Sequence, residues 1–214
     1  MFMHKNWRKT DLIDKMRSQA AKRSLKDLTV GPVITWPNEA IKAHIDACLE
    51  LDGSELLFGG VPLKNHSIPA VYGSYEPTAI KVPLKHFRNK KKRELICTEL
   101  FGPFQIVVEY GTNDVDFLLD TINGLPHHLT AACVSNDRMF VDKVMGNTIN
   151  GTQYEGLRAR TTGAPQNHWF GPSGDPRGAG IGTAGAIQLT WSHHREIVSD
   201  YGPVKEDWTM PKPT

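Results

Sequence analysis

The segment from Asn150 to Gly182 is the strongest candidate for a ligand-binding part of this 214-residue chain. It is rich in glycine, carries Tyr154 and Trp169, and has the hydrophobic period of neither a helix nor a strand. Loops of this length in compact domains are binding loops, lids or linkers, and the large aromatic residues argue against a disordered linker. Tyr154, Arg158 and Arg160 are candidates to bind an anion, although arginines in such loops more often fasten the loop to the core. The sequence favours a binding loop, with a loop that only wraps the core as the alternative.

Two other patterns match ligand sites only in residue type and spacing. His127–His128 and His193–His194 are adjacent pairs, which point to opposite faces of a strand, and no Cys/His cluster accompanies them. The sequence therefore predicts no metal site. Gly180-x-Gly182-x-x-Gly185 has the spacing of a dinucleotide fingerprint, but no apolar strand precedes it. These glycines are interpreted as turn residues.

Three cysteines without paired spacing indicate a reducing compartment. Cys48 falls on the apolar face of a predicted helix and Cys133 falls within an apolar strand, so both are interpreted as inert core thiols. Cys97 lies two residues before Glu99, and we expect it near any site that Glu99 belongs to.

The overall charge excludes some classes of partner. The chain has 25 basic and 23 acidic residues, which is too balanced for an obligate nucleic-acid or membrane protein. No apolar stretch approaches the roughly 20 residues of a membrane span. We therefore expect no nucleic-acid partner and no direct membrane insertion. The basic run Lys85–Arg93 is the exception, and it is interpreted as a solvated loop, with contact to an acidic partner as the alternative.

The elements that position these residues alternate between strands and helices, which predicts an α/β fold with a largely parallel sheet covered by helices. Apolar periodicity predicts helices after Thr10, after Pro37, over residues 115–122, and from Ser135 or Asn136 to Gly146. Short apolar runs predict strands at 54–58, 78–82, 105–110, 129–134, 148–150 and 196–201, with those at 54–58 and 129–134 buried. Asn150 thus ends a strand and opens the long loop, which is where ligand loops of such sheets lie.

Several motifs resemble those of the aldehyde dehydrogenase superfamily. Glu99-Leu100-Phe101-Gly102-Pro103 resembles its Glu-(Ile/Leu)-Phe-Gly-Pro signature, and residues 160–183 (RTTGAPQNHWFGPSGDPRGAGIGT) resemble its substrate loop and glycine turn. Within that superfamily the chain resembles the plant-type branch of mitochondrial 1-pyrroline-5-carboxylate dehydrogenases. Further matches follow in the family's order: DLTVGPV (27–33), LFGG (57–60), EPTAI (76–80) and HLTAACVSND (128–137). The resemblance covers almost the whole chain.

The resemblance implies a domain organisation and a location. Residues 1–185 would form a domain like the family's catalytic domain, without the segment of the nucleophile. Residues 186–214 would form a C-terminal helix and strand tail. The strand at Arg195–Tyr201 would pair with a neighbouring subunit, so we expect a protein partner or a homo-oligomer through residues 195–204. The location implied is mitochondrial.

The resemblance also implies roles for individual residues. Glu99 would accept hydrogen bonds from the hydroxyls of the nicotinamide ribose, since a carboxylate offers two acceptors to a vicinal diol, and Phe101 would pack near the nicotinamide. Main-chain N–H groups at Gly163 and Ala164 would hold the α-carboxylate of the substrate, and Phe170 would wall its aliphatic part. Ala164 stands where animal-type relatives have a serine, so this anchoring would rest on the main chain.

In the family, a dinucleotide-binding half, a general-base glutamate and a nucleophilic cysteine precede a segment like FMHKNW (2–7). The resemblance thus implies a C-terminal part that holds no catalytic residue and binds no NAD alone. Two interpretations remain. The favoured one is a non-catalytic structural or assembly subunit. The other is one part of an active NAD-dependent dehydrogenase of glutamate γ-semialdehyde in proline catabolism, whose remainder is on another chain or unrecorded.

Overall fold

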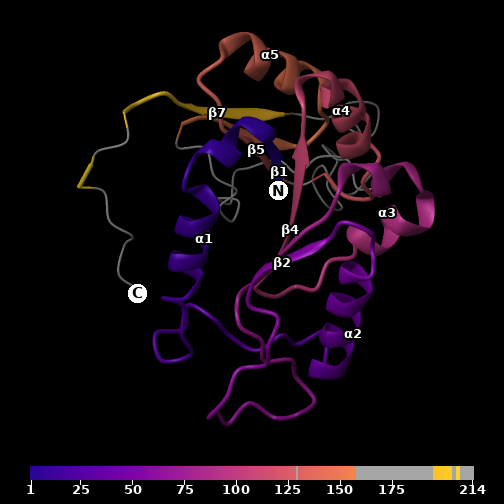
Figure 1. The fold of residues 1–214 in the computed structure, drawn as a ribbon. Coiled ribbons are helices and arrows are strands. Elements are labelled where there is room, and N and C mark those ends of the chain that lie inside the picture. Colours follow the sequence, from indigo (N-terminus) through magenta and orange to yellow (C-terminus); the bar gives the residue numbers. More distant parts are fainter. Residues whose placement is uncertain (129, 158–194, 204–205, 208–214) are drawn as a thin grey trace, which may run out of the picture. The chain divides into compact units, whose positions relative to one another are not determined.

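The computed structural model describes residues 1–128, 130–157, 195–203 and 206–207, which belong to two compact units (Figure 1). The first unit comprises Met1–Val115, and the described part of the second begins at Asp116. Each unit has its own sheet, and the predicted α/β class with largely parallel sheets is confirmed. The expected boundary near residue 185 lies outside the described residues.

The sheet of the first unit has four strands in the order β1-β4-β3-β2. Strand β4 (Phe104–Tyr110) is central and pairs in parallel with β1 (Phe2–His4) and with β3 (Thr78–Lys81). Strand β2 (Glu55–Phe58) closes one edge in the antiparallel direction. The apolar runs predicted β3 and β4, whereas the three-residue β1 was not predicted.

Helices cover both sides of this sheet (Figure 1). Helix α1 (Leu12–Ala20) follows a short 3-10 turn, η1 (Lys5–Lys9), and begins at Leu12, whose amide donates to the Thr10 hydroxyl (3.3 Å). The apolar face of α1 packs against Met3, Ala79 and Val107 of the sheet. Helix α2 (Asn38–Leu49) buries Ile41, Ile45 and Cys48, the face that its periodicity predicted.

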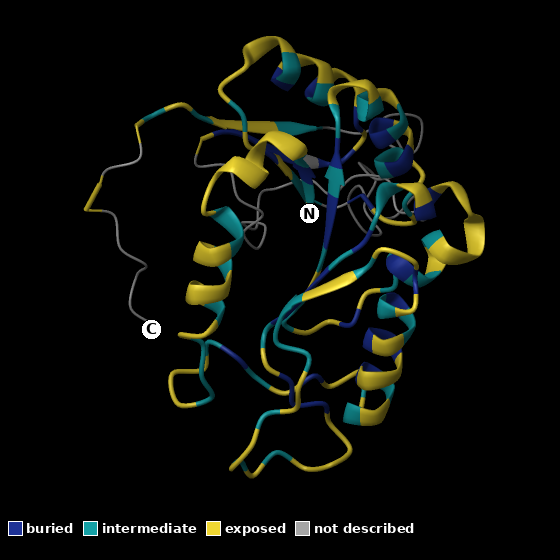
Figure 2. Cartoon of the chain, in the orientation of Figure 1, coloured by how far each residue is buried: buried dark blue, intermediate teal, exposed yellow. Residues whose placement is uncertain are grey.

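Two predictions in this unit are wrong. Strand β2 is an edge strand, and Glu55 and Leu56 are exposed rather than buried (Figure 2). The basic run at Lys85–Arg93 is not a loop. It forms a 3-10 turn, η2 (Leu84–Arg88), followed by helix α3 (Lys90–Ile96), because the buried Phe87 and Ile96 anchor it to the core.

The second unit has a parallel sheet in the order β5-β6-β7. Its strands are β5 (Thr130–Cys133), β6 (Thr152–Gly156) and β7 (Glu196–Asp200). Helix α5 (Arg138–Asn147) lies beside β6, and its Val141 and Met145 form a small core with Cys133 of β5. Its N-cap is Asp137, whose carboxylate accepts the Phe140 amide (3.2 Å), and not Ser135 or Asn136 as the sequence predicted.

Helix α4 spans Val115–Asn123 after the 3-10 turn η3 (Thr112–Asp114), and it buries Leu118 and Leu119 as its period predicted. The strand predicted at 148–150 is wrong, because the chain enters its strand only at Thr152. The segment that forms β6 is Thr-Gln-Tyr-Glu-Gly, and its inward residues include Gln153 and Glu155, so it lacks the apolar pattern of a buried strand. No helix in the described ranges has both the length and the apolar character that crossing a membrane requires.

Candidate functional site

The segment between α3 and β4 alternates between exposed and buried side chains. Glu99 is exposed, Leu100 is buried, and Phe101 exposes 70% of its surface. Leu100 is therefore packed into the first unit, while the residues on either side of it stay at the surface. The segment presents a carboxylate and an aromatic ring, two residues apart, to the solvent.

Phe101 has a backbone φ of +48°, in the left-handed region that a residue with a side chain rarely adopts. Such a conformation costs on the order of 1–3 kcal/mol and persists only where the surroundings impose it. Here they do. The Leu100 carbonyl accepts the Thr35 hydroxyl (3.3 Å), and the Pro103 carbonyl accepts the Thr78 amide (2.7 Å). Strained residues of this kind cluster at ligand contacts, so Phe101 is a candidate to contact a ligand.

Gly102 allows a close approach that no other residue would permit. A Cβ at this position would lie 2.6 Å from Cγ2 of Val33, well inside van der Waals contact. The glycine therefore lets the main chain lie directly against Val33, which sets the position of Phe101 beside it.

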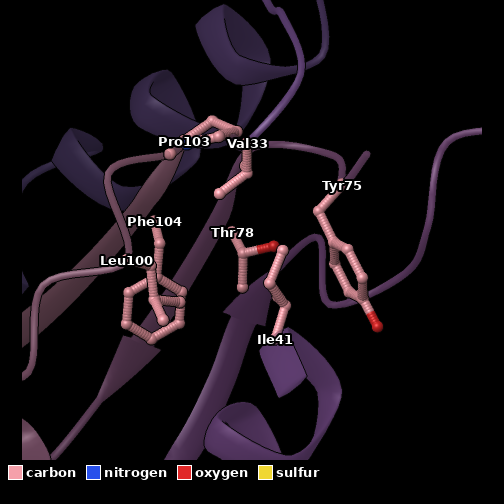
Figure 3. A pocket seen from close by; sticks show the side chains of 8 residues that line it. Val33, Ile41, Tyr75, Thr78, Leu100, Pro103 and Phe104 are labelled. Atoms are coloured by element: carbon pink, nitrogen blue, oxygen red, sulfur yellow. The ribbon is translucent and has the colours of Figure 1, made fainter. Parts of the chain in front are cut away.

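A very small pocket, with a volume of about 10 Å³, lies behind this segment. Figure 3 shows the side chains that line it, with Leu100 and Phe104 on one side and Val33, Thr78, Ile41 and Tyr75 around the other. The Thr78 hydroxyl already accepts the Gly60 amide (2.8 Å) and donates to the Glu76 carbonyl (2.7 Å). Pockets for small molecules usually measure about 300–1,000 Å³ and offer convergent polar groups. This pocket is better described as the apolar surface against which residues 99–104 pack.

None of the three cysteines has the environment of a nucleophile. Burial raises the pKa of the Cys48 thiol to about 11 and, together with the neighbouring Glu155 carboxylate, that of Cys133 to about 11. Burial also raises the pKa of Cys97. Since the thiolate is the reactive form, each of these thiols is protonated and inert at neutral pH. The interpretation of Cys48 and Cys133 as core thiols agrees with their burial.

The second unit holds a polar cluster that the sequence did not predict. Glu155 on β6 is 3% exposed, and its carboxylate accepts hydrogen bonds from Arg138 (3.0 Å), from the Ser199 hydroxyl and from the Tyr201 hydroxyl. The Arg138 guanidinium also lies over the Tyr201 ring, 5.7 Å from its centroid. Burial alone would raise the pKa of Glu155, but the three donors outweigh it and hold the pKa below its usual value. The signal in the sequence was the alternation of Gln153 and Glu155 within a segment that carries no apolar pattern.

The predicted site residues divide into two groups. Glu99 and Phe101 lie close together and exposed, in an arrangement that could face a ligand. Gly163, Ala164 and Phe170 lie outside the described residues, as do Arg158 and Arg160. Tyr154, the third candidate for an anion contact, is 7% exposed in β6. In the part of the chain that the structure describes, no group of three or more His, Cys, Asp or Glu residues could hold a metal ion.

Comparison with known proteins gives a consistent result, although no family model matches the chain. The whole chain is 54% identical to the mitochondrial delta-1-pyrroline-5-carboxylate dehydrogenase 12A1 of Arabidopsis thaliana and 54% identical to a probable aldehyde dehydrogenase of Linum usitatissimum. It spans 39% of the length of each relative, in the C-terminal part.

The fold agrees with these relatives. The structure of a succinate-semialdehyde dehydrogenase from Burkholderia pseudomallei matches with a TM-score of 0.59 at 21% identity, over 80% of this chain and 33% of that one. At this identity the likeness concerns the fold alone. The 54% identity over the length of the chain and the shared fold lead to one conclusion: the chain belongs to the aldehyde dehydrogenase superfamily.

Proposed function

We propose that this chain is a C-terminal part of an NAD-dependent 1-pyrroline-5-carboxylate dehydrogenase that is inactive alone and serves as a structural or assembly subunit. The relative in Arabidopsis thaliana is named as a delta-1-pyrroline-5-carboxylate dehydrogenase, and the chain is 54% identical to it over the 39% of its length that the chain spans. The observation that carries the proposal is the pair of Glu99 and Phe101, held outward by a strained backbone. In this proposal the two side chains contact the nicotinamide end of NAD.

The residues fit that role chemically. The exposed carboxylate of Glu99 can accept two hydrogen bonds from the adjacent hydroxyls of a ribose, and the exposed ring of Phe101 offers an apolar face to a flat heterocycle. When bound, NAD supplies the acceptor for the hydride that leaves the aldehyde carbon. The chain contributes only this contact, so we expect it to bind the cofactor weakly or not at all when no other part of a dehydrogenase is present.

Inactivity of the isolated chain rests on its thiols. The chemistry of an aldehyde dehydrogenase begins with a thiolate adding to the aldehyde carbon. Cys48, Cys97 and Cys133 all have raised pKa values from burial, which makes each a poor nucleophile.

The substrate proposal is glutamate γ-semialdehyde, in equilibrium with 1-pyrroline-5-carboxylate, within proline catabolism. Main-chain groups at Gly163 and Ala164 would hold its α-carboxylate, and Phe170 would pack on its aliphatic part. A mitochondrial location follows from the name of the Arabidopsis thaliana relative.

The assembly role rests on strand β7. It pairs with β6 along one edge, and among the described strands nothing pairs with its other edge. Ile197 and Val198 on β7 and Tyr201 just after it are all partly exposed, at 46%, 38% and 53%. An open strand edge with apolar side chains is a template for pairing with another chain. We therefore assign a protein partner, or a second copy of the chain, to residues 195–204.

Turnover assays distinguish the two interpretations. The purified chain is incubated with NAD and glutamate γ-semialdehyde, alone and with the unmatched N-terminal region of the Arabidopsis thaliana relative, and NADH formation is followed. We expect no turnover in either case. Turnover by the chain alone would overturn the proposal. Turnover only in the mixture, lost in Glu99→Gln, would favour the alternative, in which the chain is one part of an active dehydrogenase.

A further inference from the structure

The first unit displays a compact basic cluster at the junction of η2 and α3. Five consecutive residues, Arg88–Lys92, are exposed, and four of them are basic (Figure 2). We call the exposed lysines Lys90, Lys91 and Lys92, together with Arg88, the basic knuckle.

The fold holds the basic knuckle in place. Phe87 just before it and Ile96 in the last turn of α3 are each 4% exposed, so the backbone is anchored on both sides. The Asn89 side chain caps the helix by accepting the Lys92 amide (3.1 Å). The cations are therefore displayed by an ordered turn with buried anchors, which lowers the entropy lost when they bind.

The charge of the chain is distributed unevenly between residues 85–93 and the rest of the sequence. The run Lys85–Arg93 contains six basic residues and no acidic one, which leaves 19 basic and 23 acidic residues elsewhere. The Lys85 ammonium is paired with Asp52. Lys90, Lys91 and Lys92 take part in none of the ion pairs found among the described residues. The run therefore accounts for the net positive charge of the chain, since acidic residues outnumber basic ones in the rest of the sequence.

We propose that the basic knuckle is a docking surface for a membrane that contains anionic phospholipids. An ordinary protein interface has an apolar centre, but no large apolar side chain of residues 84–96, all of which are described, is among the exposed ones. Proteins that bind single-stranded nucleic acid stack bases on exposed aromatic rings, whereas Phe87 is buried against the ring of Phe2. A charged planar surface needs neither feature, because clustered basic residues alone attract it.

The expected strength of membrane binding follows from the number of basic side chains. Each lysine or arginine near an anionic membrane contributes enough attraction for roughly a fivefold gain in partitioning, and the contributions are screened within a Debye length of about 8 Å at physiological salt. Removing three lysines should therefore weaken binding by about a hundredfold, and added salt should have a similar effect. No side chain of the knuckle inserts into the hydrocarbon, so binding is peripheral and reversible.

Vesicle sedimentation tests the proposal with the full chain. The probes are phosphatidylcholine vesicles with and without about 30% phosphatidylserine, at low and high salt. The test variant is Lys90→Gln, Lys91→Gln, Lys92→Gln. A matched control, Lys22→Gln, Lys26→Gln, Lys64→Gln, removes the same charge at three exposed lysines elsewhere in the first unit. Thermal unfolding of both variants checks that the fold is kept.

The expected result is binding to the anionic vesicles only, lost at high salt, about a hundredfold weaker in the test variant and reduced much less in the control. Equal losses in the two variants would overturn the proposal, because net charge rather than the knuckle would then govern binding. Absence of binding to anionic vesicles would also overturn it. So would knuckle-dependent binding to a single-stranded oligonucleotide at concentrations where the vesicles do not bind.

Discussion

Phe101 and Leu28 are two exposed residues whose backbones lie in the left-handed region, with φ of +48° and +58°. At such a position a glycine removes the clash between Cβ and the following carbonyl, which outweighs the greater freedom of glycine in the unfolded chain. We expect Phe101→Gly and Leu28→Gly each to raise the free energy of unfolding by about 1 kcal/mol. Phe101→Ala should give no such gain, since alanine keeps the Cβ.

Denaturant unfolding of the three variants provides the measurement. If Phe101→Ala were as stable as Phe101→Gly, the gain would come from removing an exposed ring and not from relieving strain. A confirmed difference would mean that the chain retains a strained residue at the proposed nicotinamide contact at a cost in stability.

The buried Glu155 carboxylate makes a second prediction at this scale. At neutral pH, Glu155→Gln should lower the free energy of unfolding by about 2 kcal/mol, because hydrogen bonds to a charged acceptor are replaced by weaker ones. The pKa of Glu155 in the folded chain lies below its ordinary value of 4.5. The stabilisation is therefore fully present above about pH 4.5 and is lost as the pH falls through the lowered pKa.

Unfolding curves from pH 7 to pH 3 for the wild type and Glu155→Gln measure this difference directly. The control is Asp142→Asn, which removes another partner of Arg138 whose side chain is 51% exposed. Exposed ion pairs contribute little, so this variant should differ from the wild type by less than about 0.5 kcal/mol. A gap between wild type and Glu155→Gln that stayed constant down to pH 3 would contradict the assignment.

At the scale of elements, the sequence predicted helices better than strands. Helices α2 and α4 were found because Ile41 and Ile45, and Leu118 and Leu119, recur at the helical period. Strand β6 was missed because its inward side chains are polar: Gln153 donates to Thr148, and Glu155 accepts from three donors. Hydropathy does not predict such a strand, and two of the donors to Glu155 come from residues 44 and 46 positions away.

The candidate site was predictable only in part. Glu99 and Phe101 were identified by resemblance to a family motif, and the structure adds that both are exposed and that Phe101 is strained. No propensity indicates that strain, because it depends on hydrogen bonds from Thr35 and Thr78, far away in the sequence. The roles of Gly163, Ala164 and Phe170 stay predictions.

Two glycines of the second unit should respond to alanine in opposite directions. Gly156 ends β6 with φ of +103°, and a Cβ there would overlap the Asp200 carbonyl of β7. Gly146 lies inside α5 and has no atom within 4 Å of an added Cβ. We expect Gly156→Ala to lower the free energy of unfolding by more than 2 kcal/mol and Gly146→Ala to raise it by about 0.5–1 kcal/mol.

Thermal unfolding followed by circular dichroism compares these two glycine variants. Similar melting temperatures for Gly156→Ala and the wild type would mean that β6 and β7 do not approach as closely as the structure has it.

At the scale of the whole molecule, the open edge of β7 predicts self-association or binding to a partner. Ile197→Lys places a charge at a position that is 46% exposed and leaves the pairing of β7 with β6 intact. We expect this variant to be monomeric by sedimentation velocity at concentrations where the wild type associates, with little change in stability. Met139→Lys, at an 80% exposed position on α5, is the matched control and should associate as the wild type does. A wild type that stays monomeric at high concentration would refute self-association through this edge and leave only a different protein as its partner.

The Glu155 cluster also constrains the order of events during synthesis. The carboxylate on β6 leaves the ribosome 44 residues before Ser199 and 46 before Tyr201, two of its three donors. At roughly 5–20 residues per second, the nascent second unit waits several seconds with this carboxylate lacking two of its partners. Burying it early would cost more than leaving it in water, so β6 cannot complete its sheet until the last strand arrives. Completion of β7 is therefore the step that supplies the Glu155 carboxylate with its two missing donors.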